Sequence, residues 1–451
     1  MITRTALFLL CLLASFSAWA AEITLARAVE MALEHAPAMK AAEAGRDAAG
    51  QDFEIGRAAL LPRLDATGSH QLRKQKTRYD DPQSVFRPDL KYRDSTVALR
   101  AVQPLFDLER WAGYRQGALS AETGEMRLRL ERQRLMLETA QTYLEAVMAG
   151  SALSAARAKE ESAERLSAQA KAMFEAGVSA VNERLEADAR RDLAVAERFA
   201  AENSLDQAVA RLASLTGDYE PKVISPLISS RPPEGLSIEP EAWESRASES
   251  ALSVRLARLQ FRTAEKEETK AWGSNLPKVE AFASIEGNRA TSGQLGGTRS
   301  RNQAIGVQVS MPLFAGGGDW AGLNKSKKAA LQAEFTLQDD IRLARLTARQ
   351  ALLGYSASIS QLHAMQKAVA SAKEASNAAR AGHEVGLRTM SDVLDADERR
   401  FEAEKNLAEA EAQFVFAELQ LKSSVGTLDS EPLPEVFGSG NSVSAAVDTL
   451  R

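Results

Sequence analysis

The feature that most constrains this chain is an internal repeat of about two hundred residues. Three landmarks occur in the same order in both halves. A Leu-Pro pair at 61–62 recurs at 276–277, and Pro-Leu-Phe at 104–106 recurs at 312–314. The third landmark, Gly177, recurs as Gly386. Self-similarity at a nearly constant spacing indicates that one supersecondary unit has been duplicated, so the two halves are expected to share one fold.

Each half has the pattern helix, two strands, long helix, turn, helix. Both strand pairs alternate apolar and polar residues and end near a proline, which is typical of β-hairpins. The first repeat is predicted at 21–216, with a leading helix to about 59, a β-hairpin at about 61–104, a long helix at 107–176 and a helix at 181–216. The second is predicted at 241–428, with a leading helix to about 275, a β-hairpin at about 277–313, a long helix at 319–385 and a helix at 390–426.

The long helices are the most unusual elements of this plan. Neither 107–176 nor 319–385 contains a proline, and a helix of that length spans ~105 Å. Globular helices are far shorter on average. Apolar residues at heptad spacing, Leu205 with Leu212 and Phe414 with Leu421, indicate lateral coiled-coil packing. The fold class expected is therefore mainly α, with tandem-duplicated coiled-coil hairpins and two β-hairpins per chain.

Three segments fall outside the repeats. Residues 1–20 have an apolar run followed by Ala18-Trp19-Ala20, which is typical of a cleaved secretory signal peptide. A proline-rich connector is predicted at 217–240 and a polar tail at 429–451. No later stretch is apolar for long enough to cross a bilayer as a helix, so insertion into a membrane would have to use strands.

Composition excludes several classes of function. The net charge of −5 argues against a nucleic-acid binder, which usually has a basic surface. The single cysteine, Cys11, excludes a disulfide within the chain and a zinc site built on several thiolates. The glycines at 316–318 match no Walker or Rossmann spacing, and the four histidines form no catalytic motif. We therefore expect no enzymatic activity and no cofactor.

Four strands per chain cannot form a closed membrane barrel, because bacterial barrels begin at about eight strands and a bilayer cannot hold an open sheet edge. Several chains must close one barrel together. Two chains would give eight strands and a filled interior, whereas three would give twelve strands and an aqueous lumen.

The second repeat contains the run Val-Gly-Leu-Arg-Thr-Met-Ser-Asp-Val-Leu-Asp-Ala at 385–396 and Leu-Lys-Ser-Ser-Val-Gly-Thr-Leu at 421–428. Together these runs resemble the TolC family of outer membrane efflux channels. The resemblance implies a homotrimer with a twelve-stranded barrel in the lipid of the outer membrane of a Gram-negative bacterium. Below the barrel it implies a periplasmic helical tunnel, with an equatorial belt formed by the connector and the C-terminal region.

The resemblance also implies a function. The chain would be the passive channel-tunnel of a tripartite system for type I protein secretion, multidrug efflux or both. Its partners would be a periplasmic adaptor protein and an inner-membrane ABC or RND transporter. An alternative from another class is a non-conducting trimeric coiled-coil stalk or adhesin anchored in the outer membrane, which would need heptads but not paired hairpins.

Two sets of candidate residues lie near the turns between long helices. The turns Gly177-Val178 and Gly386-Leu387 are the expected tips, where the resemblance implies docking of the adaptor. Asp392 and Asp395 stand at i and i+3 on one helical face, and the resemblance places such aspartates at the periplasmic constriction. For Asp392 a capping box with Thr389 is an alternative role.

The resemblance further implies a latch that holds the tunnel shut. Arg388 corresponds to an arginine that bonds to first-repeat residues at the positions of Asn182 and Glu183. His383 replaces a tyrosine that supplies a second link in the family, and a histidine there would give the gate a pH response near ~6.5. The alternative for Arg388 is a solvated helix-start residue that forms at most a weak surface ion pair.

Overall fold

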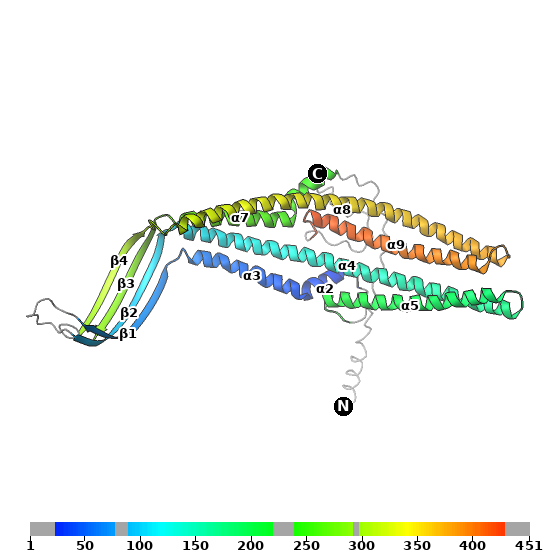
Figure 1. The fold of residues 1–451 in the computed structure, drawn as a ribbon, viewed down its shortest axis with the longest axis horizontal. Helices are drawn as coiled ribbons and strands as arrows, with labels where there is room; N and C mark the ends of the chain where they lie inside the picture. The colour runs from blue at the N-terminus through cyan, green and yellow to red at the C-terminus, as the bar shows by residue number, and fades with distance from the viewer. Residues whose placement is uncertain (1–22, 77–88, 220–238, 292–296, 429–451) are drawn as a thin grey trace, which may run out of the picture. The chain divides into compact units, whose positions relative to one another are not determined.

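The computed structural model describes residues 23–76, 89–219, 239–291 and 297–428. The predicted signal peptide (1–20), most of the predicted connector and the predicted tail (429–451) lie outside the described residues. The first repeat contains α2 (Leu25–His35), α3 (Pro37–Ala58), β1 (Arg63–Lys76), β2 (Asp89–Phe106), α4 (Leu108–Glu175) and α5 (Val181–Thr216) (Figure 1). The second contains α6 (Pro240–Ser250), α7 (Leu252–Gly273), β3 (Lys278–Ala290), β4 (Thr298–Ser310), α8 (Gly318–Glu384) and α9 (Met390–Ser424). For one chain, the predicted fold class of long helical hairpins with two β-hairpins is confirmed.

The leading helix of each repeat differs from the prediction, because each is broken once. Ala36 separates α2 from α3 with extended backbone (φ −62°, ψ 126°), and Pro37 explains this, since a residue before proline is disfavoured in the helical region. Ala251 separates α6 from α7 with nearly the same angles (φ −53°, ψ 135°) but no proline follows. Here the Ser250 hydroxyl donates to the carbonyl of Val425 (2.8 Å), a contact with α9 that no local pattern predicts.

The chain divides into two compact units, and the helices α3, α4, α7 and α8 each cross the boundary between them. One unit, residues 44–127 and 256–339, contains the four strands in one antiparallel sheet of order β1-β2-β3-β4. Within the chain β1 and β4 each have one strand neighbour. Among the described residues, no helix is long and apolar enough to cross a membrane.

The register gives the sheet two unlike faces. Successive residues of a strand point to opposite faces, and directly paired residues share a face. Leu64 pairs with Ala101, Leu99 with Ile285, and Ala283 with Ile305, so these residues form an apolar face. The other face carries mainly polar residues, among them Thr67, Ser69, Gln71, Thr96, Ser284, Asn288 and Gln308. A sheet with one apolar and one polar face separates two different environments.

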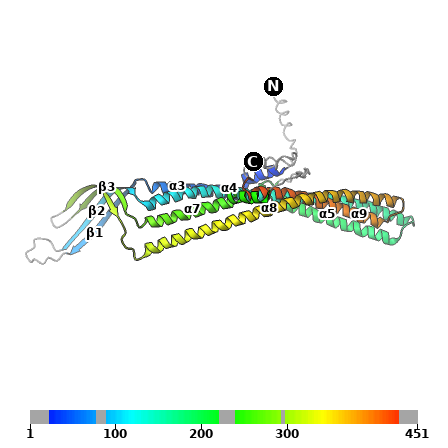
Figure 2. The same ribbon diagram turned by 90° about the horizontal axis from the view of Figure 1, so that it is seen from above.

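The other unit contains two helical hairpins, α4 with α5 and α8 with α9, whose partners lie side by side in both views (Figures 1 and 2). Its core joins the two repeats, because one cluster of buried residues contains Tyr143 of the first repeat and both Tyr355 and Phe414 of the second. Tyr143 of α4 is buried and its hydroxyl donates to the carbonyl of Ile23 (3.0 Å). Tyr355 of α8 stacks on Phe414 of α9, with ring centroids 5.6 Å apart. This packing fixes the helices from which the hairpin tips extend.

Candidate functional site

The two hairpin tips have the same backbone turn. Gly177 and Gly386 adopt left-handed conformations (φ 74° and 75°), which glycine accepts without the penalty that a Cβ atom brings. The amide of Val178 donates to the carbonyl of Met173 (3.0 Å), and the amide of Leu387 donates to that of Gly382 (2.8 Å). This is the hydrogen-bond pattern of a Schellman motif. Val178 is 69% exposed and Leu387 is 82% exposed, so both tips present an apolar side chain to solvent.

The helix starts after the two turns differ. At the start of α9, the Thr389 side chain accepts from the Asp392 amide (3.1 Å) and Asp392 Oδ2 accepts from the Thr389 amide (2.9 Å), which forms a capping box. The Thr389 backbone N–H, and then its hydroxyl, hold the pKa of Asp392 below its usual value. At the start of α5 the cap residue is Ala180, which has no side-chain hydrogen bond. Asp392 therefore has the capping role that the sequence left open.

Asp395 forms an ion pair between the two hairpins. Its carboxylate lies 2.8 Å from Nη1 of Arg190 on α5. The same guanidinium reaches Glu186 (3.2 Å) and Glu398 (3.7 Å). The Ser391 hydroxyl also donates to Glu186 (3.2 Å). The start of α9 is thus tied to α5, and half-exposed Asp395 carries a partly compensated charge within one chain.

A buried acid, Asp397, is a central contact that the sequence analysis missed. It accepts from Ser376 of α8 (2.5 Å), Arg380 of α8 (2.6 Å) and Ser162 of α4 (2.8 Å). Burial raises the pKa of Asp397, but the three donors outweigh it and hold this pKa below the usual value. Asp188 is its counterpart in the first repeat. The recurrence of Leu-x-Ala-Asp at 185–188 and 394–397 is the sequence signal that could have identified this pair of aspartates.

The predicted latch residues are not joined within one chain. Among the described residues, Arg388 makes no hydrogen bond or ion pair with Asn182 or Glu183. The carbonyl oxygen of Arg388 instead lies 3.1 Å from Nδ1 of His383, across the turn. A link from Arg388 to a neighbouring chain stays a prediction.

The family model described as "Outer membrane efflux protein" matches residues 28–218 and 243–427, one segment in each repeat. The chain belongs to the outer membrane efflux protein family. It is 29% identical to the outer membrane protein TolC of Vibrio cholerae over 429 residues, with 94% of each chain covered. It is 28% identical to the alkaline protease secretion protein AprF of Pseudomonas aeruginosa, with 89% of this chain and 84% of that protein covered.

Solved structures show the same fold. The outer membrane protein VceC of Vibrio cholerae superimposes with a TM-score of 0.75 at 19% identity, over 89% of this chain and 96% of that one. The CmeC outer membrane channel of Campylobacter jejuni gives a TM-score of 0.76 at 18% identity, over 94% of this chain and 88% of that one.

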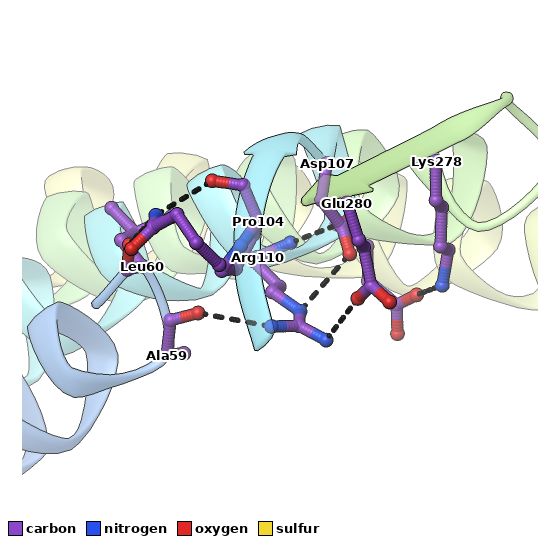
Figure 3. A network of polar contacts seen from close by, with 9 residues as sticks. Ala59, Leu60, Pro104, Asp107, Arg110, Lys278 and Glu280 are labelled. Atoms are coloured by element: carbon purple, nitrogen blue, oxygen red, sulfur yellow. Dashed lines mark hydrogen bonds and ion pairs between the residues drawn. The ribbon is translucent and has the colours of Figure 1, made fainter. Parts of the chain in front are cut away.

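A second polar cluster of this efflux protein lies where strands meet helices (Figure 3). Asp107 is buried before α4 and accepts from the amide of Arg110 (3.1 Å), while its other oxygen lies 3.1 Å from the Arg110 guanidinium. The guanidinium also donates to the carbonyl of Ala59 (3.3 Å) and to Glu280 of β3 (2.9 Å). Beside it Lys278 pairs with Glu109 (2.6 Å) (Figure 3). The cluster joins the start of α4 to the end of α3 and to β3.

Proposed function

We propose that this efflux protein is the outer-membrane channel of a tripartite export system. Three chains would pair β4 of one with β1 of the next and close a twelve-stranded barrel, because each chain leaves those two edges unpaired. The observation that carries this proposal is the two-faced sheet, with an apolar face for lipid and a polar face for an aqueous lumen. The long hairpins would extend from the barrel into the periplasm as a tunnel.

The partners we propose are a periplasmic adaptor and an inner-membrane ABC or RND transporter. Relatives named for secretion of alkaline protease and other proteases support a role in type I export of polypeptides. A relative named as an outer membrane efflux protein, from Brucella suis, supports a role in efflux. The exposed side chains of Val178 and Leu387 would dock the adaptor. Val178→Glu or Leu387→Glu should leave the trimer intact and abolish export, and normal export would remove the tips from that role.

The constriction we propose lies at Asp392 and Asp395, which three chains would repeat around the tunnel axis. Asp392 keeps one oxygen outside the capping box, and Asp395 is half-exposed beside Arg190. Clustered carboxylates favour bound cations. Replacing both by alanine should weaken cation selectivity, measured as the reversal potential in a salt gradient. Unchanged selectivity would place the constriction elsewhere.

The latch we propose joins Arg388 of one chain to Asn182 and Glu183 of a neighbouring chain. Arg388 is available for such a contact, since its described hydrogen bonds within the chain are made by its backbone, through the amide to Gly382 and the carbonyl to His383. Arg388→Ser combined with Glu183→Ala should raise single-channel conductance severalfold without loss of the trimer. Conductance equal to that of the parent protein would exclude this latch.

Planar-bilayer recording of the purified protein tests the function itself. A channel closed at its tip gives discrete openings of low conductance. A coiled-coil stalk or adhesin, the alternative class, gives no current although it forms a trimer. Trimers that insert and never conduct would overturn the proposal.

A further inference from the structure

The apolar face of the sheet changes character at the end away from the helices. Near the helices it carries apolar side chains such as Leu64, Leu99 and Ile305, all exposed in one chain. At the other end the same face carries seven exposed basic residues, which we call the basic belt: Lys74, Lys76, Lys91, Arg93, Arg289, Arg299 and Arg301. The belt crosses all four strands.

The strand register places these residues on one face. Lys74 pairs with Lys91, and Arg289 pairs with Arg299, so cations stand opposite cations. Like charges in directly opposed positions are destabilising unless something lies between them. The register positions of this face at this end of the described strands carry one acidic residue, Asp89, opposite Lys76. The belt therefore has a large excess of positive charge on a chain whose net charge is −5.

The basic residues of the polar face behave differently. Arg73 lies 3.4 Å from Asp94, and Arg63 lies 2.9 Å from Asp65. Arg100 lies over the ring of Phe282, 5.7 Å from its centroid. None of the seven belt residues forms an ion pair with any residue that the structure describes. Among the described residues, the sheet thus gives its cations partners on the face proposed for the lumen and no ion-pair partner on the face proposed for lipid.

We propose that the basic belt binds the phosphate groups of phosphorylated lipid headgroups in the external leaflet. This inference rests on the proposed function, because it needs the apolar face to contact the bilayer. The belt then lies where the hydrocarbon ends, and long Lys and Arg side chains extend from apolar surface to a polar interface. Unpaired cations at such an edge attract anionic headgroups, and the guanidinium fork matches phosphate oxygens. An exported polypeptide would pass along the opposite face and would not meet the belt.

With the helices in the periplasm, as proposed above, the end of the sheet that carries the belt lies at the external leaflet. The apolar face near the helices carries no basic residue in the described strands, and Lys278 there lies on the other face and is paired with Glu109. Headgroup binding at one end only would fix the depth of the barrel in the bilayer.

The test uses the full-length trimer reconstituted in phosphatidylcholine vesicles that contain one-tenth diphosphorylated lipid A. The measurement is the amount of lipid A retained per trimer after extraction in mild detergent. In the belt variant, Arg289, Arg299 and Arg301 are each changed to Gln, and we expect retention to fall about tenfold or more. The matched control changes Arg63, Arg73 and Arg100 to Gln, which removes equal charge from the other face, and should retain lipid A like the parent.

A further variant and two competition measurements complete the test. Changing the same three belt arginines to Lys keeps the charge and should restore most of the retention, which excludes misfolding as the cause. Equal retention by the belt variant and the parent would overturn the inference, as would equal loss in the control. Complete displacement of lipid A by millimolar inorganic phosphate, or belt-dependent binding of poly-glutamate with lipid retention unchanged, would also overturn it. Bilayer conductance of the parent separates the two proposals, since a conducting channel without lipid retention refutes only the belt.

Discussion

The hairpins α4/α5 and α8/α9 began as copies, and one duplicated contact shows how they diverged. In the first hairpin Ser167 donates to Asp188 (2.7 Å), and in the second Ser376 donates to Asp397 (2.5 Å), and in both the partners are 21 positions apart in the sequence. The side chain of Asp188 is 31% exposed, whereas that of Asp397 is 4% exposed. Asp397 has two further donors, Arg380 of its own hairpin and Ser162 of the other hairpin, whereas Asp188 lies 3.9 Å from Arg184 of its own helix.

Both hairpins therefore contain the same serine–aspartate contact, and in the second hairpin the aspartate also joins the first hairpin. The acceptors Asp395, Asp397 and Glu398 lie on α9. Their donors from the first hairpin are Lys159 and Ser162 on α4 and Arg190 on α5. Side chains of α9 in the second hairpin therefore bind side chains of both helices of the first hairpin. The start of α9 is also stabilised by a side-chain cap, which the start of α5 lacks.

The largest difference between the hairpins should appear in the free energy of unfolding when Asp397 and Asp188 are each replaced by alanine. Asp397→Ala leaves two buried hydroxyls and one guanidinium without their acceptor, so we expect a loss of about 1–3 kcal/mol in the free energy of unfolding. Asp188→Ala should cost ~0–1 kcal/mol, because that carboxylate is partly solvated. Thermal unfolding of both variants in one detergent, followed by circular dichroism, checks this order. Equal losses would mean that the two contacts never diverged.

The next largest effect is the pH dependence of the stability that Asp397 contributes to the second hairpin. The folded-state pKa of Asp397 lies below its unfolded value, so its contribution is present above the unfolded pKa and is lost as pH falls through the folded pKa. The stability difference between the parent and Asp397→Asn should therefore be constant from about pH 8 to 5 and shrink below about pH 4. Measuring unfolding midpoints across this range tests the sign. A difference that disappears already between pH 8 and 5 would assign the dependence to another group.

The smallest expected effect is on local stability at the N-terminal caps of α5 and α9. Thr389→Ala should destabilise the second tip by about 1 kcal/mol, since the Asp392 amide loses its acceptor. The reverse change, Ala180→Thr, should stabilise the first tip by a similar or smaller amount, because Glu183 already stands where a capping box needs it. Hydrogen exchange at the first turns of α5 and α9 would measure both. Exchange that rises in both variants would show that α5 cannot accept a cap.

The features of the fold that depend on neighbouring residues in the sequence could be predicted from it. Alternating residues in the strands and glycines at the two turns are local signals, and each lies where the pattern placed it. The break at Ala251 was not predictable, because the hydroxyl of the preceding Ser250 bonds to Val425, the residue that caps α9. Asp397 was missed because an aspartate is expected at the surface and its donor Ser162 lies 235 residues away. The pairing of Arg190 with Asp395 likewise depends on how two hairpins meet, which one sequence does not encode locally.

If the second hairpin holds the tip closed, the contact of Arg190 with Asp395 and Glu398 must break when the channel opens. Single-channel conductance of Arg190→Ala in a planar bilayer measures this directly. Arg191→Ala is the matched control, because among the described residues Arg191 forms its ion pair with the neighbouring Asp192 (2.7 Å) and none with α9. We predict a severalfold rise in conductance for Arg190→Ala and parental conductance for Arg191→Ala. Parental conductance in both variants, with trimers intact, would contradict closure by the second hairpin.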